Sequence, residues 1–135
     1  MATTRAKKKP TASPIDRLRL LCLALPETSE RLSHGEPKFF IREKKTFVTS
    51  VDDHHGDGVL GFWAAAPIGA QAEWINEGPE RYFRPPYVGH RGWIGVRLDA
   101  PSTDWDEVKE IVTDAYCQVA PRSLAALVRP NEPLR

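Results

Sequence analysis

Basic side chains gather at two points of the chain where turns are predicted, and their chemistry is the neutralisation of phosphate. Lysine and arginine bind nucleic acid by displacing counterions from the phosphates. Two basic hairpins at one edge of a domain would place cations on both sides of a phosphate backbone. Charged turns are also common because turns are solvated, so that alternative stays open. The candidate nucleic-acid-binding residues are Lys38, Arg42, Lys44, Lys45, Arg84, His90 and Arg91.

Aromatic residues accompany the second basic group, which is formed by Arg84, His90 and Arg91. Tyr82, Phe83 and Tyr87 have rings on which bases could stack, although packing in the core is the alternative. The chain also has four tryptophans, and large aromatics dominate small cores. We expect Trp93 and Trp105 to be largely buried and to pack the last helix onto the sheet. A tryptophan-lined groove for a peptide or small ligand is the other interpretation.

Carboxylates and imidazoles cluster in residues 52–58, DDHHGDG, and such groups are metal ligands. The pattern is not an EF-hand, because the twelfth residue counted from Asp52 is Trp63 rather than glutamate. Neighbouring His54 and His55 would also point to opposite sides of an extended chain. We therefore expect a solvated loop and assign no metal and no cofactor.

The sequence contains no Gly-x-Ser-x-Gly motif, dinucleotide fingerprint or P-loop, so no catalytic residue is assigned. Cys22 and Cys117 are read as small, reduced core residues of helices. An enzyme remains a third hypothesis, with the sequence favouring a protein without catalysis. It would gain support if a histidine met a carboxylate in a concave pocket. The four histidines are His34, His54, His55 and His90.

Length and composition predict one globular domain with a short basic tail. The chain has 135 residues, of which 41% are hydrophobic and 27% charged, and its net charge is +1. Residues 1–13 carry four positive charges and no acid, so they are predicted to be a disordered tail and the remainder is slightly acidic. The domain is expected over 14–128, with a short C-terminal tail over 129–135. The tail lacks the apolar segment of a secretion signal, and no apolar run of about 18 residues occurs, so we expect a cytoplasmic protein without a membrane span.

Hydrophobic periodicity and breaker residues then predict the elements that position these groups. Ser13 and Pro14 begin a helix that Pro26 ends, and residues 26–37 read as a polar turn. Ser102 or Thr103 caps the last long helix. The predicted strands are 39–42, 46–51, 59–63, 82–84 and 93–98, and the predicted helices are 14–25, 67–77, about 104–120 and a short turn at 123–128.

The predicted order is α-β-β-β-α-β-β-α. Strands joined by tight turns pair in antiparallel fashion, and the helices would then cover one face of the sheet. The predicted fold class is therefore α+β, one compact domain with about five antiparallel strands.

Short motifs in this order resemble the MmcQ/YjbR-like family over about residues 15–128, although alanine stands at Ala115 where the family usually has serine. The resemblance implies a compact α+β domain with an antiparallel sheet of about five strands. Members are commonly labelled DNA-binding because of structural likeness to a "double wing" domain, and no catalytic residues carry over. The matching residues are Leu25-Pro26-Glu27, Glu30, Gly35-Glu36-Pro37-Lys38-Phe39, Lys45-Thr46-Phe47, Pro86-Tyr87, Trp93, Leu98-Asp99 and Ala115-Tyr116.

The leading hypothesis is therefore weak, largely non-specific DNA binding through the basic hairpins. The alternative is a protein- or small-ligand-interaction domain that uses an aromatic sheet face without catalysis. Salt separates the two, because phosphate contacts weaken as salt rises whereas apolar contacts persist.

Overall fold

One antiparallel sheet organises the computed structural model, which describes residues 13–53, 56, 58–99 and 101–130. Within these residues six strands pair in the order β1-β2-β3-β4-β6-β5. The predicted antiparallel α+β fold is confirmed, with one strand more than expected. The strands are β1 (Thr28–Ser33), β2 (Glu36–Ile41), β3 (Lys45–Asp52), β4 (Leu60–Ala64), β5 (Tyr82–Phe83) and β6 (Ile94–Arg97).

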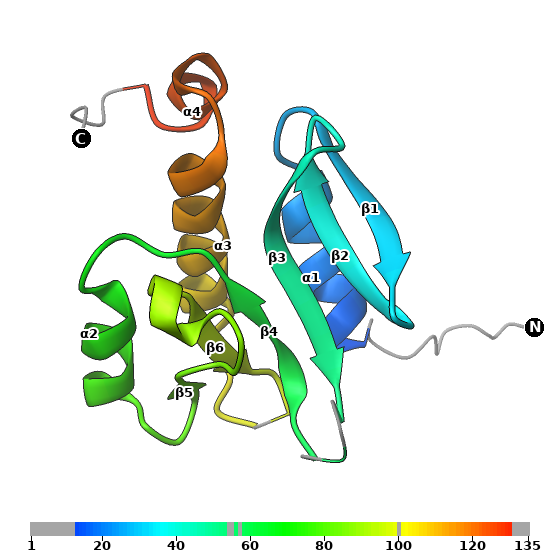
Figure 1. The fold of residues 1–135 in the computed structure, drawn as a ribbon. Helices are drawn as coiled ribbons and strands as arrows, with labels where there is room; N and C mark the ends of the chain where they lie inside the picture. Colours follow the sequence, from blue (N-terminus) through cyan, green and yellow to red (C-terminus); the bar gives the residue numbers. More distant parts are fainter. Residues whose placement is uncertain (1–12, 54–55, 57, 100, 131–135) are drawn as a thin grey trace, which may run out of the picture.

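Two helices form the second layer of the fold. Figure 1 shows α1 (Pro14–Leu23) behind β2 and β3, with α3 (Trp105–Val119) running beside it on the same side of the sheet. The short α4 (Arg122–Val128) follows α3, as predicted, and α2 (Ala70–Glu77) lies beside β5 and β6. Among the described residues, no helix combines the length and apolar character needed to cross a membrane.

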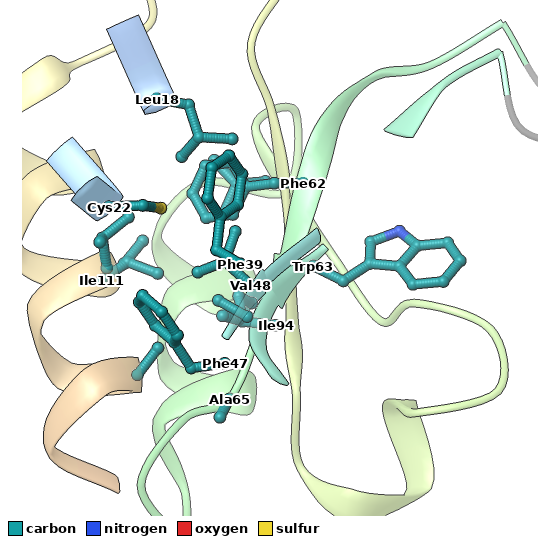
Figure 2. Packing of buried hydrophobic residues seen from close by; sticks show 14 of the residues in the cluster. Leu18, Cys22, Phe39, Phe47, Val48, Phe62, Trp63, Ala65, Ile94 and Ile111 are labelled. Atoms are coloured by element: carbon teal, nitrogen blue, oxygen red, sulfur yellow. The ribbon is translucent and has the colours of Figure 1, made fainter. Parts of the chain in front are cut away.

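The core lies between the sheet and these helices. Successive residues of a strand point to opposite faces, so Phe39 in β2, Phe62 in β4 and Ile94 in β6 share the face that meets the helices. Figure 2 shows these side chains packed with Leu18 of α1 and Ile111 of α3. All five are fully or almost fully buried.

The register between β2 and β3 shifts because Phe39 pairs with Val48 whereas Phe40 pairs with Thr46, which leaves Phe47 as an extra residue of β3. Phe47 is fully buried in the core. The Phe47 ring meets Tyr116 of α3 edge-to-face at 5.7 Å. The Tyr116 hydroxyl donates to the Pro26 carbonyl oxygen at 2.7 Å. This buried phenol therefore joins α3, β3 and the turn after α1.

The ends of α1 are closed by side chains, as the sequence predicted for its start. The Asp16 backbone N–H donates to the Ser13 hydroxyl oxygen at 3.1 Å. At the other end the Thr28 hydroxyl donates to the carbonyl oxygens of Leu25 and Cys22, at 2.9 and 3.0 Å. Burial, with a contribution from the negative charge of Glu30, raises the pKa of the Cys22 thiol.

The predicted polar turn over 26–37 is wrong, because β1 and the start of β2 occupy most of it. Strand β1 is polar since it forms an edge of the sheet, where side chains need not be apolar. Its two charged side chains have specific partners. Glu30 faces the helices and pairs with Arg19 of α1 at 2.8 Å, whereas Arg31 lies 4.0 Å from the centre of the Phe40 ring on the other face.

The second helix begins later than predicted. Gly69 has a φ of +86°, which interrupts the chain before Ala70 and leaves Ile68 outside the helix and fully exposed. Trp74 and Ile75 are half-buried and are the residues of α2 that pack against the core.

The start of α3 also differs from expectation. Asp104, rather than Ser102 or Thr103, is the cap, because its Oδ1 accepts hydrogen bonds from the N–H groups of Asp106 and Glu107 at 3.0 and 3.2 Å. Trp105 packs against the core as predicted, although it is partly rather than fully buried. It is the first residue of α3, where the Arg17 guanidinium covers its ring at 4.1 Å.

Strand β5 is attached to α3 by a polar contact at the far edge of the sheet. The buried Tyr82 hydroxyl donates to Oε1 of Glu107, and the Arg81 guanidinium lies 3.5 Å from the same oxygen. Burial and this hydrogen bond both raise the pKa of the Tyr82 phenol. This contact holds β5 in place, and the loop between β5 and β6 begins directly after it.

The layered core predicts unequal responses to truncating two large apolar side chains. Phe39→Ala should lower the free energy of unfolding by about 3–5 kcal/mol, because the ring is fully buried and would leave a cavity. Ile68→Ala removes an exposed side chain and should change it by no more than about 0.5 kcal/mol. Urea unfolding measures both, and a loss below about 1 kcal/mol for Phe39→Ala would contradict this core.

Candidate functional site

A groove of about 1200 Å³ is lined mainly by the sheet face opposite the packed core and by the loop between β5 and β6, and it reaches Gln118 and Val119 at the C-terminal end of α3. It combines aromatic, basic and acidic side chains from both halves of the chain. Its lining residues are Ser33, His34, Gly35, Glu36, Lys38, Lys45, Thr46, Thr49, Asp52, Asp53, Trp63, Tyr87, Val88, Arg91, Trp93, Gln118 and Val119.

Strand register builds the floor of the groove. Lys38 of β2 pairs with Thr49 of β3, and Thr49 pairs with Trp63 of β4, so the three side chains share one face. Figure 2 shows Trp63 pointing away from the cluster formed by Phe39, Phe47 and the other core residues. The Trp63 side chain lines the groove although only 7% of its surface is exposed.

Phe83 of β5 closes the floor on one side. It pairs with Gly95 of β6, which in turn pairs with Trp63. Gly95 leaves the space that the ring occupies, since a Cβ at this position would lie 2.4 Å from the Phe83 ring. The groove floor therefore ends at Trp63.

The loop between β5 and β6 forms one wall. Its short 3₁₀ helix, η2 (Gly89–Arg91), is held to α2 because the Gln71 side-chain amide donates to the carbonyl oxygens of Gly89 and Trp93, at 2.9 and 2.6 Å. Trp93 is 7% exposed, so its predicted burial is confirmed, but it lines the groove on the open face instead of packing α3 onto the sheet.

Tyr87 stands on this wall with its ring exposed. The ring centre lies 6.3 Å from that of Trp63, at an angle of 51°, and 66% of the residue surface is accessible. Its φ is +66°, in the left-handed region that non-glycine residues seldom adopt. Pro86 precedes it and accepts a 2.6 Å hydrogen bond from the Val88 N–H. The loop thus holds a large, exposed ring over the groove in a strained backbone conformation.

Three of the seven predicted phosphate-binding residues meet in this groove. Lys38 comes from the middle of β2, Lys45 from the start of β3, and Arg91 from η2. The Arg91 guanidinium lies 5.4 Å from the centre of the Trp93 ring. The fold therefore brings cations of both predicted basic groups onto one face of the sheet.

The other four lie outside the groove lining. Arg42, in the turn between β2 and β3, pairs with Glu27 at 2.7 Å, and this hydrogen-bonded ion pair raises the pKa of its guanidinium. Lys44 is exposed in the same turn. His90 is exposed within η2, and Arg84 is exposed before it, with the Arg84 stem packed against Gly89.

Three carboxylates at one end of the groove were not predicted as site residues. Glu36, Asp52 and Asp53 line it where β2 begins and β3 ends, and the Asp52 N–H lies 3.4 Å from Oε2 of Glu36. The Asp52-Asp53 pair directly after a buried strand was the signal for two of them. Lys45 lies at the opposite end of β3. The groove therefore has an acidic end and a basic end.

The structure describes only some of the residues that could take part in metal binding or catalysis. His34 lines the acidic end, where its Nδ1 lies 3.3 Å from the Ser33 hydroxyl oxygen, and His90 lies outside the lining. His54, His55 and Asp57 of the predicted solvated loop fall outside the described residues. Within the described part of the chain, no group of three or more His, Cys, Asp or Glu side chains is arranged to hold a metal ion.

The positive φ of Tyr87 predicts an inverted order of two substitutions. Glycine ordinarily destabilises a protein by about 0.5–1 kcal/mol relative to alanine, but alanine costs about 1–2 kcal/mol in the left-handed region. Tyr87→Gly should therefore be at least as stable as Tyr87→Ala in thermal unfolding. Leu127, exposed in α4, is the control site, and there the glycine variant should be the less stable. The same order at both sites would contradict the left-handed conformation of Tyr87.

Comparisons with known proteins agree with this fold. The crystal structure of Deinococcus radiodurans protein DR2400, which carries a DUF419 domain, is similar with a TM-score of 0.66 and 17% sequence identity, over 87% of this chain and 88% of that one. No curated protein sequence matches the chain. The YjbR family model matches residues 23–118, from the end of α1 to the end of α3. The chain therefore belongs to the YjbR family.

Proposed function

We propose that this protein binds nucleic acid through the groove on the open face of the sheet. The observation that carries the proposal is the convergence of Lys38, Lys45 and Arg91 beside exposed aromatic surface. These residues come from three separate segments, so their meeting is a product of the fold rather than of a basic stretch of sequence. Cations alongside aromatic rings are the recurring components of nucleic-acid grooves.

The proposed contact is electrostatic and directed at the backbone. Each lysine or arginine that neutralises a phosphate releases condensed counterions, which makes the binding free energy favourable at low salt. Phosphate contacts position a protein but carry no sequence information. Three cations and a net charge of only +1 for the chain support weak, largely sequence-independent binding.

The acidic end of the groove favours a second candidate, an interaction domain for a protein or small ligand. Glu36, Asp52 and Asp53 would repel phosphates but could pair with cationic groups of a partner. Such a domain would use Trp63 and Tyr87 as apolar surface, and its binding would persist as salt rises.

A comparison of single lysine and arginine variants tests the proposal. Lys45→Ala and Arg91→Ala should each reduce the slope of log affinity against log salt by about 0.7–0.9, because each removes one phosphate contact. Lys109→Ala is the control, since it makes the same change in net charge at an exposed position on α3, in the helix layer. The measurement is fluorescence anisotropy with a labelled oligonucleotide from 25 to 200 mM salt.

Two results would overturn the proposal. The first is the absence of oligonucleotide binding at the lowest salt. The second is an equal effect of Lys109→Ala and Lys45→Ala, which would mean that affinity follows net charge and not the groove.

A further inference from the structure

We infer that the ligand of the groove is a single-stranded nucleic acid, with an unpaired base stacked on Tyr87 beside Trp63 and the phosphates at Lys45 and Arg91. The inference rests on the proposed function and specifies its ligand class. Three features of the groove support it: the exposed ring of Tyr87, the left-handed backbone conformation of the same residue, and the separation of charge along the groove.

The exposed ring is the first feature. Large aromatic side chains are usually buried in a small domain, yet two thirds of Tyr87 is accessible while Trp63 beneath the same wall is 7% exposed. The 6.3 Å separation of the two rings leaves Tyr87 as the outer layer of an aromatic pair. A nucleobase has a flat face that can extend this pair by one more ring.

The backbone of Tyr87 is the second feature. A left-handed φ at a tyrosine is unfavourable, and such strain is concentrated at functional sites. Here the conformation is supported by the neighbouring chain, with Pro86 on one side and the η2 segment anchored by Gln71 on the other. A ring that is already oriented loses little further freedom when a base stacks on it.

The separation of charge along the groove is the third feature, and it favours a single-stranded ligand over a duplex. A duplex carries a phosphate charge about every 1.7 Å along its axis, so one lying along the groove would also bring phosphates to Glu36, Asp52 and Asp53. A single strand can keep its phosphates at the basic end while its bases lie over the floor. In addition, the faces of duplex bases are stacked on one another, whereas unpaired bases are available to aromatic side chains.

The test is anisotropy at 50 mM salt with a labelled 12-nucleotide DNA strand and with the same sequence as a duplex. The parent protein should bind the single strand at least about tenfold more tightly than the duplex. Tyr87→Ala should weaken single-strand binding about tenfold, in keeping with the loss of one stacking contact. Tyr87→Phe retains the ring and should stay within about threefold of the parent. Ile68→Ala, which removes an exposed apolar side chain outside the groove lining, should have no effect.

The outcomes separate this inference from the proposed function. If the duplex binds as tightly as the single strand, or if Tyr87→Ala binds like the parent, the inference is overturned. If Lys45→Ala still flattens the salt slope in that case, phosphate binding by the groove stands without base stacking. If neither DNA binds, both proposals fail. A thermal melt of Tyr87→Ala confirms that the variant is folded when its affinity is measured.

Discussion

The packing of α3 on the centre of the sheet determines which face of this domain is available to a partner. Tyr116 is the focus of that packing, because its ring meets Phe47 and its hydroxyl bonds the Pro26 carbonyl oxygen. With Val108 and Ile111 also buried, α3 fills the face that carries the large apolar residues of β3 and β4. The alternation of side chains along a strand then leaves Thr49 and Trp63 on the other face.

The open face is shaped by what the loop between β5 and β6 adds to it. Phe83 occupies the area above Gly95, and Tyr87 and Arg91 stand beyond it as a wall. The resulting groove runs along β3, from Lys45 at one end to Asp52 at the other. The basic and acidic ends of the groove follow from the order of residues along β3. The separation of charge is therefore set by the backbone and does not depend on side-chain motion.

Local signals in the sequence were enough for most elements. The cap at Ser13, the turn between β2 and β3 and the extent of α3 depend on neighbouring residues and were predicted to within a residue or two. Strand β1 was not, because an edge strand with the sequence TSERLS has no apolar alternation and is identified only by its pairing with β2. The count of five strands instead of six has the same cause.

The site could be predicted only in part for a related reason. Basic residues near turns were visible in the sequence, but their convergence depends on strand order and on where η2 lies across the sheet. Lys38 and Arg91 are distant in sequence, and Arg42, four residues from Lys38, is instead paired with Glu27. Tyr87 was one of three aromatic residues considered for base stacking, but its exposure, its backbone angle and its distance from Trp63 are encoded by no local pattern.

The most direct test of the groove as the binding site is an NMR titration of the ¹⁵N-labelled protein with a short DNA strand. Binding in the groove should shift the resonances of the Trp63 indole N–H and of the backbone amides of Thr49 and Arg91, and should leave the amides of α1, on the opposite face, unchanged. Shifts confined to the helix layer, with the groove resonances unmoved, would contradict it.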